Sequence, residues 1–346
     1  MISLLSGIQQ VGIGVRDADA RFTWYRKMFG MDVPVFKDAS IAALMLPYTG
    51  GEPRKRYAIL ALNMQGGGGF EIWQYTERQS AMPTFTVEPG DLGIFGVIMK
   101  TRDVKKAHAF MQAQGLNPSP LFEDPVQGER FFVTDPDGNR FTFTRGESWF
   151  GQTSHPNGGV QGVQIGVKNM EASIRFYTRV LGFSKVRADE KKSFAEYGGK
   201  EGRRVILQAS TPFGGAFSRL LGAAEIELFE LSNNAGRKIY DGRFWGDMGF
   251  IHVCFDVNNM PELEQHCARE GHPFTVNSGN SFDMGEAAGQ FAYTEDPDGT
   301  LIEFVQTHKL PLVKKLKWYL DLRKRKPGKP LPDWMLRTMG WQRVKD

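Results

Sequence analysis

The stretch VGIGVRDADARFTWYRKMFGMDV (residues 11–33) returns in altered form as VQIGVKNMEASIRFYTRVLGFSKV (residues 163–186). Each copy begins with an alternating apolar segment that predicts a strand. It continues through an Asp or Asn that marks a helix start and then through apolar residues at helical spacing. Each helix is expected to end at a glycine, Gly30 or Gly182, where a left-handed cap is needed. The repeat decides the fold, because it indicates that one structural unit is used more than once.

A second pair of segments repeats further along the chain. FFVTDPDGNRFTFT (residues 131–144) matches FAYTEDPDGTLIEFV (residues 291–305), and in both the DPDG sequence predicts a hairpin turn between two strands. Each hairpin follows a predicted strand and helix, in residues 93–115 and 249–271. The sequence therefore predicts four strand–helix–strand–strand–strand modules, at residues 8–75, 93–145, 160–231 and 249–306.

The composition indicates a globular protein of a reducing compartment. The chain has 346 residues, of which 41% are hydrophobic, and this is enough for two or three domains. Its two cysteines, Cys254 and Cys267, make neither a disulfide framework nor a metal-ligand spacing. No segment has the pattern of a signal peptide or the length of a membrane span. We therefore expect a cytoplasmic protein.

The net charge of +4 is distributed unevenly. Residues 309–346 hold twelve Lys or Arg against three Asp, so this basic tail carries +9 and the remaining 308 residues carry −5. An acidic body gives no reason to expect a nucleic-acid partner.

The tail segment LVKKLKWYLDLRKRK (residues 312–326) predicts an amphipathic helix. Its apolar face would consist of Leu312, Leu316, Tyr319 and Leu320. Such a helix either touches an anionic membrane surface or packs against the acidic body. Packing is favoured, because the apolar stripe is short and three tryptophans are spread beyond it to fill grooves beside the modules: Trp318, Trp334 and Trp341.

The helix end FYTRVLGF (residues 176–183) and the two DPDG hairpins resemble the vicinal oxygen chelate superfamily. This superfamily includes glyoxalase I, methylmalonyl-CoA epimerase, the extradiol dioxygenases and the bleomycin- and fosfomycin-resistance proteins. The resemblance extends to about residue 308 and implies an α+β fold of four βαβββ modules. Paired modules would form curved half-barrel sheets around a metal cleft, with the helices packed outside. We expect one domain in residues 1–148, a second in residues 149–308, and the basic tail in residues 309–346.

In this superfamily the metal ligands come from the first and last strands of paired modules. At these positions modules one and four carry Gln10, Glu71, His252 and Glu303, whereas modules two and three carry Gly96, Thr142, Gly162 and Glu227. In four-module relatives of glyoxalase I the first module pairs with the fourth and the second with the third. This pairing would give one complete metal cleft and one empty cleft, with Glu227 on an exposed strand face.

The ligand set is that of some glyoxalase I enzymes, and its chemistry agrees with a metal. A core-facing amide such as that of Gln10 is costly unless something satisfies it, and two carboxylates in one buried cleft need a cation. One imidazole and three oxygen ligands suit a divalent ion of intermediate hardness. Zinc, nickel, cobalt, manganese and iron are not distinguished by such a set.

By the same resemblance, Glu303 is the first candidate for a catalytic base and Glu71 is its counterpart. A metal that chelates two adjacent oxygens would stabilise an enediolate or enolate while a carboxylate takes the proton. Isomerisation, epimerisation and β-elimination all remain open. Two other classes also stay open: an iron-dependent extradiol-type dioxygenase, and a ligand-binding or resistance protein without turnover. The dioxygenase would pair modules three and four, but Gly162 stands where its first histidine is required.

The resemblance does not extend to glutathione recognition. Gly14 stands where the glyoxalase strand usually places an arginine for the tripeptide carboxylate, which leaves Arg54, Lys55 and Arg56 as substitutes. Three glycine-containing insertions, at residues 47–56, 209–224 and 276–289, are expected to cover the cleft mouths. Their apolar residues either favour an apolar or ring-bearing substrate or only pack the loops: Phe213, Phe217, Phe282 and Met284. The expected partner is a small carbonyl or ring-bearing compound. The oligomeric state is left open.

Overall fold

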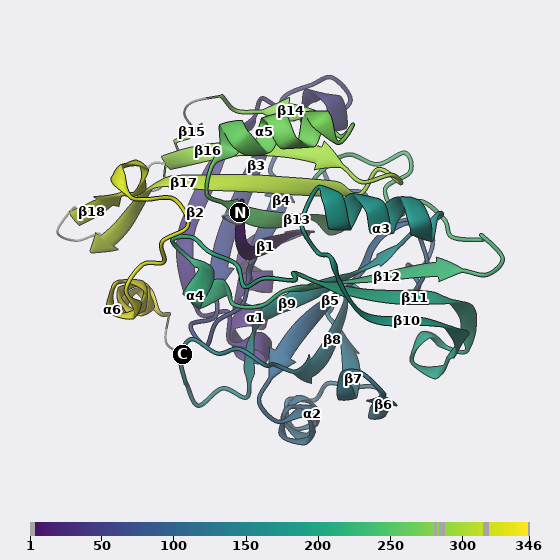
Figure 1. Ribbon diagram of the computed structural model, residues 1–346. Coiled ribbons are helices and arrows are strands. Elements are labelled where there is room, and N and C mark those ends of the chain that lie inside the picture. The colour runs from purple at the N-terminus through teal and green to yellow at the C-terminus, as the bar shows by residue number, and fades with distance from the viewer. Residues whose placement is uncertain (1–3, 280–281, 284–287, 314–317, 345–346) are drawn as a thin grey trace.

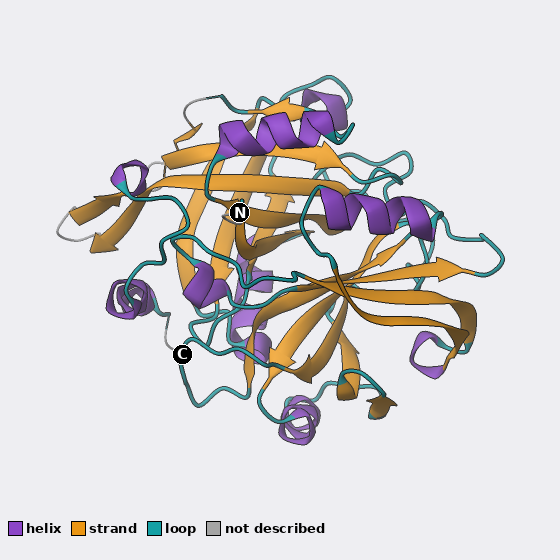
Figure 2. Cartoon of the chain, viewed as in Figure 1, coloured by secondary structure: helices purple, strands orange, loops and turns teal. Residues whose placement is uncertain are grey.

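Two large curved sheets pack against each other in the computed structural model, which describes residues 4–279, 282–283, 288–313 and 318–344 (Figure 1). One sheet has ten strands and the other has eight. Figure 2 shows that helices α2, α3 and α5 lie at the periphery of the sheets. This is the predicted α+β arrangement.

The strands and helices follow the four predicted modules. The first module consists of β1 (Leu5–Gly14), α1 (Ala18–Phe29), β2 (Val33–Ala42), β3 (Arg54–Leu62) and β4 (Gly69–Tyr75). The second consists of β5 (Gly93–Thr101), α2 (Val104–Ala113), β6 (Phe122–Asp124), β7 (Gly128–Thr134) and β8 (Arg140–Arg145). The third consists of β9 (Asn157–Gly166), α3 (Met170–Arg179), β10 (Lys185–Phe194), β11 (Lys200–Gln208) and β12 (Glu225–Leu231), with the short helix α4 (Ser218–Leu221) before β12. The fourth consists of β13 (Gly249–Val257), α5 (Met260–Arg269), β14 (Val276–Asn277), β15 (Phe282–Asp283), β16 (Ala288–Glu295) and β17 (Leu301–Val313).

The helices of modules one and three begin as the sequence predicts, but only α1 ends at its predicted glycine, because α3 ends at Arg179 with Val180 as its cap, before Gly182. The side chains of Asp17 and Asn169 cap the first turns of α1 and α3 by accepting backbone N–H groups. Gly30 ends α1 with a φ of 69°, a left-handed conformation that glycine adopts without strain.

Strand order shows which modules pair. The larger sheet runs β14-β16-β17-β13-β1-β4-β3-β2, and the smaller runs β10-β11-β12-β9-β5-β8-β7-β6. Module one therefore pairs with module four through β1 and β13, and module two pairs with module three through β5 and β9. Modules three and four lie in different sheets, so the strand pairing expected of a dioxygenase is wrong. Each sheet contains one module from the first half of the chain and one from the second half. The predicted boundary between two domains near residue 148 therefore stays a prediction.

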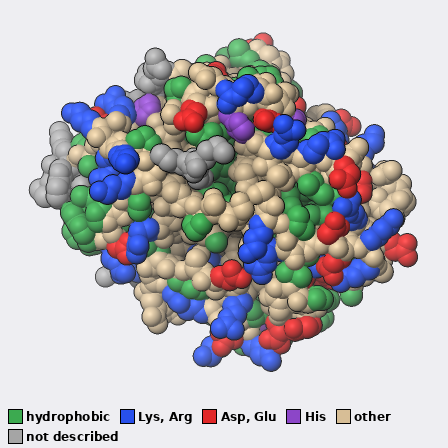
Figure 3. Space-filling model, viewed as in Figure 1, with side chains coloured by type: hydrophobic (Ala, Val, Ile, Leu, Met, Phe, Trp, Pro, Cys, Tyr) green, Lys and Arg blue, Asp and Glu red, His purple; other side chains and the backbone are tan. Residues whose placement is uncertain are grey.

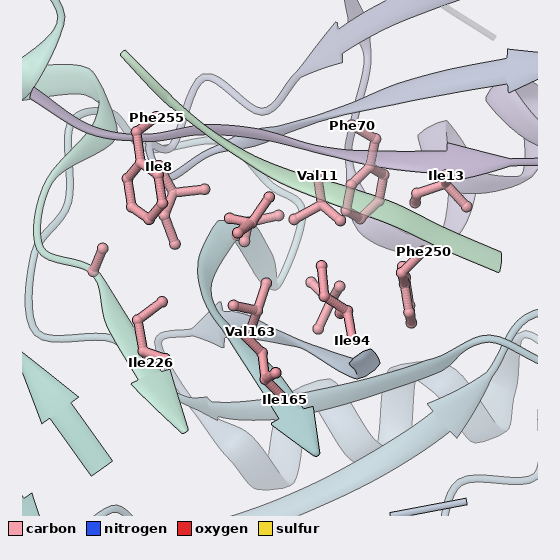
Figure 4. Packing of buried hydrophobic residues seen from close by; sticks show 14 of the residues in the cluster. Ile8, Val11, Ile13, Phe70, Ile94, Val163, Ile165, Ile226, Phe250 and Phe255 are labelled. Carbon is pink, nitrogen blue, oxygen red and sulfur yellow. The ribbon is translucent and has the colours of Figure 1, made fainter. Parts of the chain in front are cut away.

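The main core lies between the two sheets. Figure 4 shows Val11 and Phe70 of the larger sheet facing Ile94 and Val163 of the smaller one, and all four are buried. Because successive strand residues point to opposite faces, the neighbours of Val11 and Phe70 point away from this core. The clefts of the two sheets therefore open on their outer faces.

The tail is not the amphipathic helix that its sequence predicted. Strand β17 continues to Val313 and pairs with β18 (Trp318–Asp321), so this part of the tail is a hairpin. Leu316 lies outside the described residues. Backbone pairing with neighbouring strands decided the structure here, because a short apolar run fits either period.

The rest of the tail packs against the body, as favoured. Helix α6 (Asp333–Arg337) follows the hairpin, and Leu331, Leu336 and Met339 are buried in a cluster with Leu62 and Leu220. Two of the three tryptophans do not fill grooves as expected: Trp334 is 55% exposed and Trp341 is 73% exposed. The side chain of Trp318 lies outside the described part of the structure.

The surface gives two further observations. On the face shown in Figure 3, acidic and basic side chains are interspersed. Within the described part of the chain, no helix has both the length and the apolar character required to span a membrane.

Candidate metal centre

Four neighbouring strands bring the predicted ligands together. Gln10 is on β1, Glu71 on β4, His252 on β13 and Glu303 on β17, and these strands are adjacent in the order β17-β13-β1-β4. Glu71 and His252 lie on either side of Gly12, their common partner in the register. A Cβ at Gly12 would collide with the imidazole ring, so glycine is needed for the ring to lie across β1.

The polar ends of the four side chains converge. Single donor atoms of Glu71, His252 and Glu303 lie within 4.8 Å of one another. Nε2 of His252 is 2.9 Å from Oε2 of Glu303 and 3.6 Å from Oε2 of Glu71. The Gln10 amide donates to Oε2 of Glu303 at 3.3 Å. All four residues are buried, with exposed fractions of 4% for Gln10, 6% for Glu71, 0% for His252 and 7% for Glu303.

Unsatisfied atoms in this cluster fit a cation. Oε1 of Gln10 and both ring nitrogens of His252 are buried and make no hydrogen bond of acceptable geometry. Nε2 of His252 nevertheless lies within ion-pair distance of Glu303, so the two interact electrostatically when the ring is protonated. Buried polar atoms are almost always paired. The Gln10 oxygen and one nitrogen of a neutral His252 ring are acceptors, so these unpaired atoms beside two carboxylates indicate a place for an electron-pair acceptor. A divalent ion is such a group, and nitrogen and oxygen donors suit it.

The charges of the cluster are strained without a cation. Burial, and next the charge of Glu303, raise the pKa of Glu71 from 4.5 to about 7. Burial would lower the pKa of His252, but Glu303 and Glu71 raise it above its ordinary value. Burial would likewise raise the pKa of Glu303, yet His252 and a hydrogen bond from Tyr293 hold it below its ordinary value. Glu303 is thus the ionised member of the pair, and Glu71 is the member that takes a proton first.

Tyr293 is a site residue that the sequence analysis missed. Its hydroxyl donates to Oε1 of Glu303 at 2.8 Å, and Tyr293 is opposite Glu303 in the β16–β17 register. The sequence could have indicated Tyr293. Counting residues outward from the DPDG turn identifies which residue of one strand lies opposite Glu303 on the other. Trp245, whose ring is nearly parallel to that of His252 at a centroid distance of 6.4 Å, adds an aromatic wall.

The cluster lies in a cavity of about 460 Å³ with mostly apolar walls. Besides the predicted ligands Gln10, Glu71 and Glu303, its lining includes Leu44, Met45, Leu60, Leu62, Trp73, Phe217, Leu220, Trp245, Phe291 and Met339. At its edge Ile41 is 55% exposed and Leu44 is 46% exposed. Of the loop residues expected to line it, Phe217 does so, whereas Phe213 packs on Phe183 in the main core. Met284 lies outside the described residues.

Basic side chains are largely engaged around this cavity. Of the three candidates for carboxylate recognition, only Arg56 lines it, and its guanidinium pairs with Asp38 at 2.9 Å. An arginine in place of Gly14 has no room, because a Cβ there would meet the carbonyl oxygen of Asp247. Lys309 at the rim is a second basic lining residue.

The equivalent cleft of the smaller sheet holds a different arrangement. Glu227 is fully buried, so its predicted exposure is wrong. The reason is Arg130 of β7, whose guanidinium nitrogens lie 3.2 Å from Oε2 of Glu227. Gly96, Thr142 and Gly162 supply no carboxylate or imidazole there.

Comparisons with known proteins agree with this architecture. The sequence profile of the Glyoxalase/Bleomycin resistance protein/Dioxygenase superfamily matches residues 7–143 and 159–304. The chain is similar to a lactoylglutathione lyase of Schizosaccharomyces pombe, with 23% identity over 85% of this chain and 94% of that protein.

Solved structures share the fold. The glyoxalase I of Zea mays is 15% identical, with a TM-score of 0.52 over 87% of this chain and 92% of that chain. A putative dioxygenase of Bacillus subtilis is 14% identical, with a TM-score of 0.55 over 88% of this chain and 86% of that chain. The four repeated modules, their pairing and the profile match lead to one conclusion: the chain belongs to the glyoxalase/bleomycin resistance protein/dioxygenase superfamily.

Proposed function

We propose that this protein is a metal-dependent lyase or isomerase that moves a proton on the carbon beside a carbonyl group. Its substrate would be a small apolar or ring-bearing compound with two adjacent oxygens. The observation that carries the proposal is the buried Gln10, Glu71, His252 and Glu303 cluster, with three polar atoms that have no hydrogen-bond partner, at the base of an apolar cavity. The similarity to a lactoylglutathione lyase supports the same class of reaction.

The four residues of the cluster would hold the divalent ion. When bound, this ion would act as a Lewis acid toward both substrate oxygens and stabilise the negative charge that develops on deprotonation.

Glu303 is the proposed base. Its Oε1 accepts the Tyr293 hydroxyl and its Oε2 accepts the Gln10 amide, so both oxygens are held in place at the cavity wall. Its depressed pKa keeps it ionised, which a base requires before it accepts a proton. Glu71 lies on β4 and Glu303 on β17, and strands β1 and β13 separate these two strands in the sheet. Glu71 therefore approaches the cluster from the opposite side and would return the proton.

The cavity selects the substrate by its apolar walls. Trp73, Trp245 and Phe291 offer ring faces and edges to an aromatic or branched substrate. A glutathione adduct would bring two carboxylates and an amine into this cavity. The Asp38 carboxylate already engages Arg56, so charged substrate groups would lose hydration without full compensation.

The ligand set argues against the dioxygenase alternative. That chemistry uses two histidines and one carboxylate on iron, whereas the cluster has one histidine and two carboxylates.

Proton exchange tests the proposal directly. The metal-loaded protein is incubated with α-hydroxyacetophenone in D2O, and deuterium at the carbon beside the carbonyl is followed by NMR. We expect exchange with the wild type and a loss of at least about 100-fold in Glu303→Gln, with bound metal retained. Glu264→Gln, a change at an exposed carboxylate of α5 in the same module, is the control and should exchange normally.

Two outcomes would contradict the proposal. Oxygen consumption without proton exchange would support the dioxygenase alternative, and metal binding with neither reaction would support a ligand-binding protein. Full exchange by Glu303→Gln would move the base to Glu71 or to a residue outside the cluster.

A further inference from the structure

The smaller sheet carries a cleft that matches the metal cleft position by position. Gly12 is opposite Glu71 in the larger sheet, and Gln164 is opposite Glu227 in the smaller one. The hairpins that line the two clefts also begin alike: Val33 pairs with Leu62, and Lys185 pairs with Gln208. Residues of the two clefts can therefore be compared one by one.

The inner half of the second cleft is closed by a cation of the protein itself. Arg130, which is 1% exposed, bonds Glu227 and also lies 3.4 Å from Oδ2 of Asp124. Gln164 donates to Oε1 of Glu227 at 2.9 Å, and its own Oε1 occupies the space that a side chain at Gly96 would need. The guanidinium thus has the charge-neutralising role that we assign to a metal in the first cleft.

The outer half of the second cleft is a cavity of about 430 Å³. Its character is opposite to that of the metal cleft. Gln208 lines this cavity at the position where Leu62 lines the apolar cavity. Arg187 likewise corresponds to Val35, because each lies at the register shift of its own hairpin. We call it the polar cleft, and its hydrogen-bonding residues are Gln127, Thr144, Arg145, Glu147, Gln161, Arg187, Gln208 and Glu225.

Glu225 is the deepest charge of the polar cleft. It is 2% exposed, and its two carboxylate oxygens accept Nε2 of Gln127 at 2.6 Å and Nε2 of Gln208 at 3.5 Å. Arg130 is shared by Glu227 and Asp124, and among the described residues no Lys or Arg pairs with Glu225 within 4.0 Å. Arg130 and Arg187 act on Glu225 only from beyond ion-pair distance, and its hydrogen-bond partners are amides. Such a buried carboxylate favours a directly bound cationic donor from outside.

Arg187 holds the complementary charge at the mouth. Its Nη1 donates to Oε1 of Gln208 at 3.0 Å and lies 3.5 Å from Glu147, whose side chain is 66% exposed. The single amide of Gln208 therefore spans from Arg187 to Glu225. An α-amino acid has its amine and carboxylate on one carbon, which gives it a donor and an acceptor at similar spacing.

We propose that the polar cleft binds a free α-amino acid, with the protonated amine toward Glu225 and the carboxylate toward Arg187. The ligand replaces the exposed Glu147 as the partner of Arg187 and gives Glu225 a cation in direct contact. This site is separate from the metal cleft, because the two clefts belong to different sheets and open on opposite sides of the shared core. It therefore does not rest on the proposed function.

Thermal unfolding with the twenty common L-amino acids at 10 mM tests this site on the full chain. We expect at least one amino acid to raise the midpoint, and its affinity is then measured by calorimetry. The same compound without its amine, and the same compound without its carboxylate, should each bind at least roughly tenfold more weakly, because each loses one charge-assisted contact.

Two variants locate the binding. Glu225→Gln and Arg187→Gln should each weaken it at least roughly tenfold, whereas Glu123→Gln, at an exposed position of β6, should not change it. Glu303→Gln in the metal cleft should also leave it unchanged. The proposal is overturned if no amino acid shifts the midpoint, if both single-charge analogues bind as well, or if Glu225→Gln and Arg187→Gln, both folded, keep full affinity.

Discussion

Metal-free protein should become less stable as the pH rises, because Glu71 is forced to ionise beside Glu303. Its pKa is raised from 4.5 to about 7 by burial and by the neighbouring charge. In the unfolded chain Glu71 releases its proton near the ordinary value, so between the two values the folded state binds more protons. Stability from this group is therefore complete below pH 4.5 and is lost as the pH rises through about 7.

The magnitude follows from the size of the shift. A shift of roughly 2.5 pKa units at 1.36 kcal/mol per unit corresponds to about 3 kcal/mol. His252 acts in the same direction at higher pH, since its pKa is also raised. Asp256 and Asp296 are buried with raised pKa values of about 7 and about 6, so they add to the slope as well. The contribution of Glu71 to the pH dependence of stability is therefore obtained by comparing the wild type with a variant that lacks this carboxylate.

Urea unfolding of the wild type and Glu71→Gln, both treated with EDTA, measures this difference from about pH 5 to 8. We expect the free energy of unfolding of Glu71→Gln to increase relative to that of the wild type as the pH rises. The relative increase should reach about 3 kcal/mol at pH 8. Saturating zinc should reduce the part of the pH dependence of wild-type stability that comes from Glu71, because the ion offsets the repulsion between Glu71 and Glu303. A difference that does not change with pH would refute the claim that the two carboxylates need a cation.

Three other predictions follow from the two clefts and the tail. His252→Ala removes the only nitrogen ligand of the cluster, and we expect less than about a tenth of the wild-type metal content after gel filtration, measured by mass spectrometry; stoichiometric metal would contradict the assignment. Arg130→Met leaves Glu227 buried without its cation and should cost about 3–5 kcal/mol in urea unfolding, with most of the loss restored by adding Glu227→Gln; a cost below about 1 kcal/mol would show that the guanidinium is dispensable. Leu336→Ala should cost about 2–5 kcal/mol, because this fully buried side chain joins the tail to the body; an unchanged unfolding midpoint would show that the tail packs only weakly.

The fold and the main cluster were predictable because the chain repeats. Matching the DPDG hairpins and the glycine-ended helices aligned the four modules, and the resemblance to the superfamily then indicated the strand positions, occupied by Gln10, Glu71, His252 and Glu303, that would hold a metal. The side-chain period of two then placed them on one face of the sheet. Their convergence within the cleft needed no knowledge of the loops.

What failed depended on partners far away in sequence. Glu227 was expected on an exposed face because its neighbours are acidic, but Arg130, 97 residues earlier, comes from another strand and neutralises it. The cavity wall around Leu44 was missed because a connecting segment has no period to read. The tail helix was wrong because strand pairing with β16 and β18 outweighs a weak helical pattern.

The pairing of the first module with the fourth has a consequence for the order of synthesis. The side chains of Gln10 and Glu303 touch although 293 positions separate them. When a ribosome has made only modules one and two, strands β1 and β5 have not yet received their partners β13 and β9. Both edges then offer unpaired backbone groups, which are sites for association with other chains. We therefore expect the half-made chain to be the stage most prone to association with other chains, and binding of the proposed metal would show that the last module has docked.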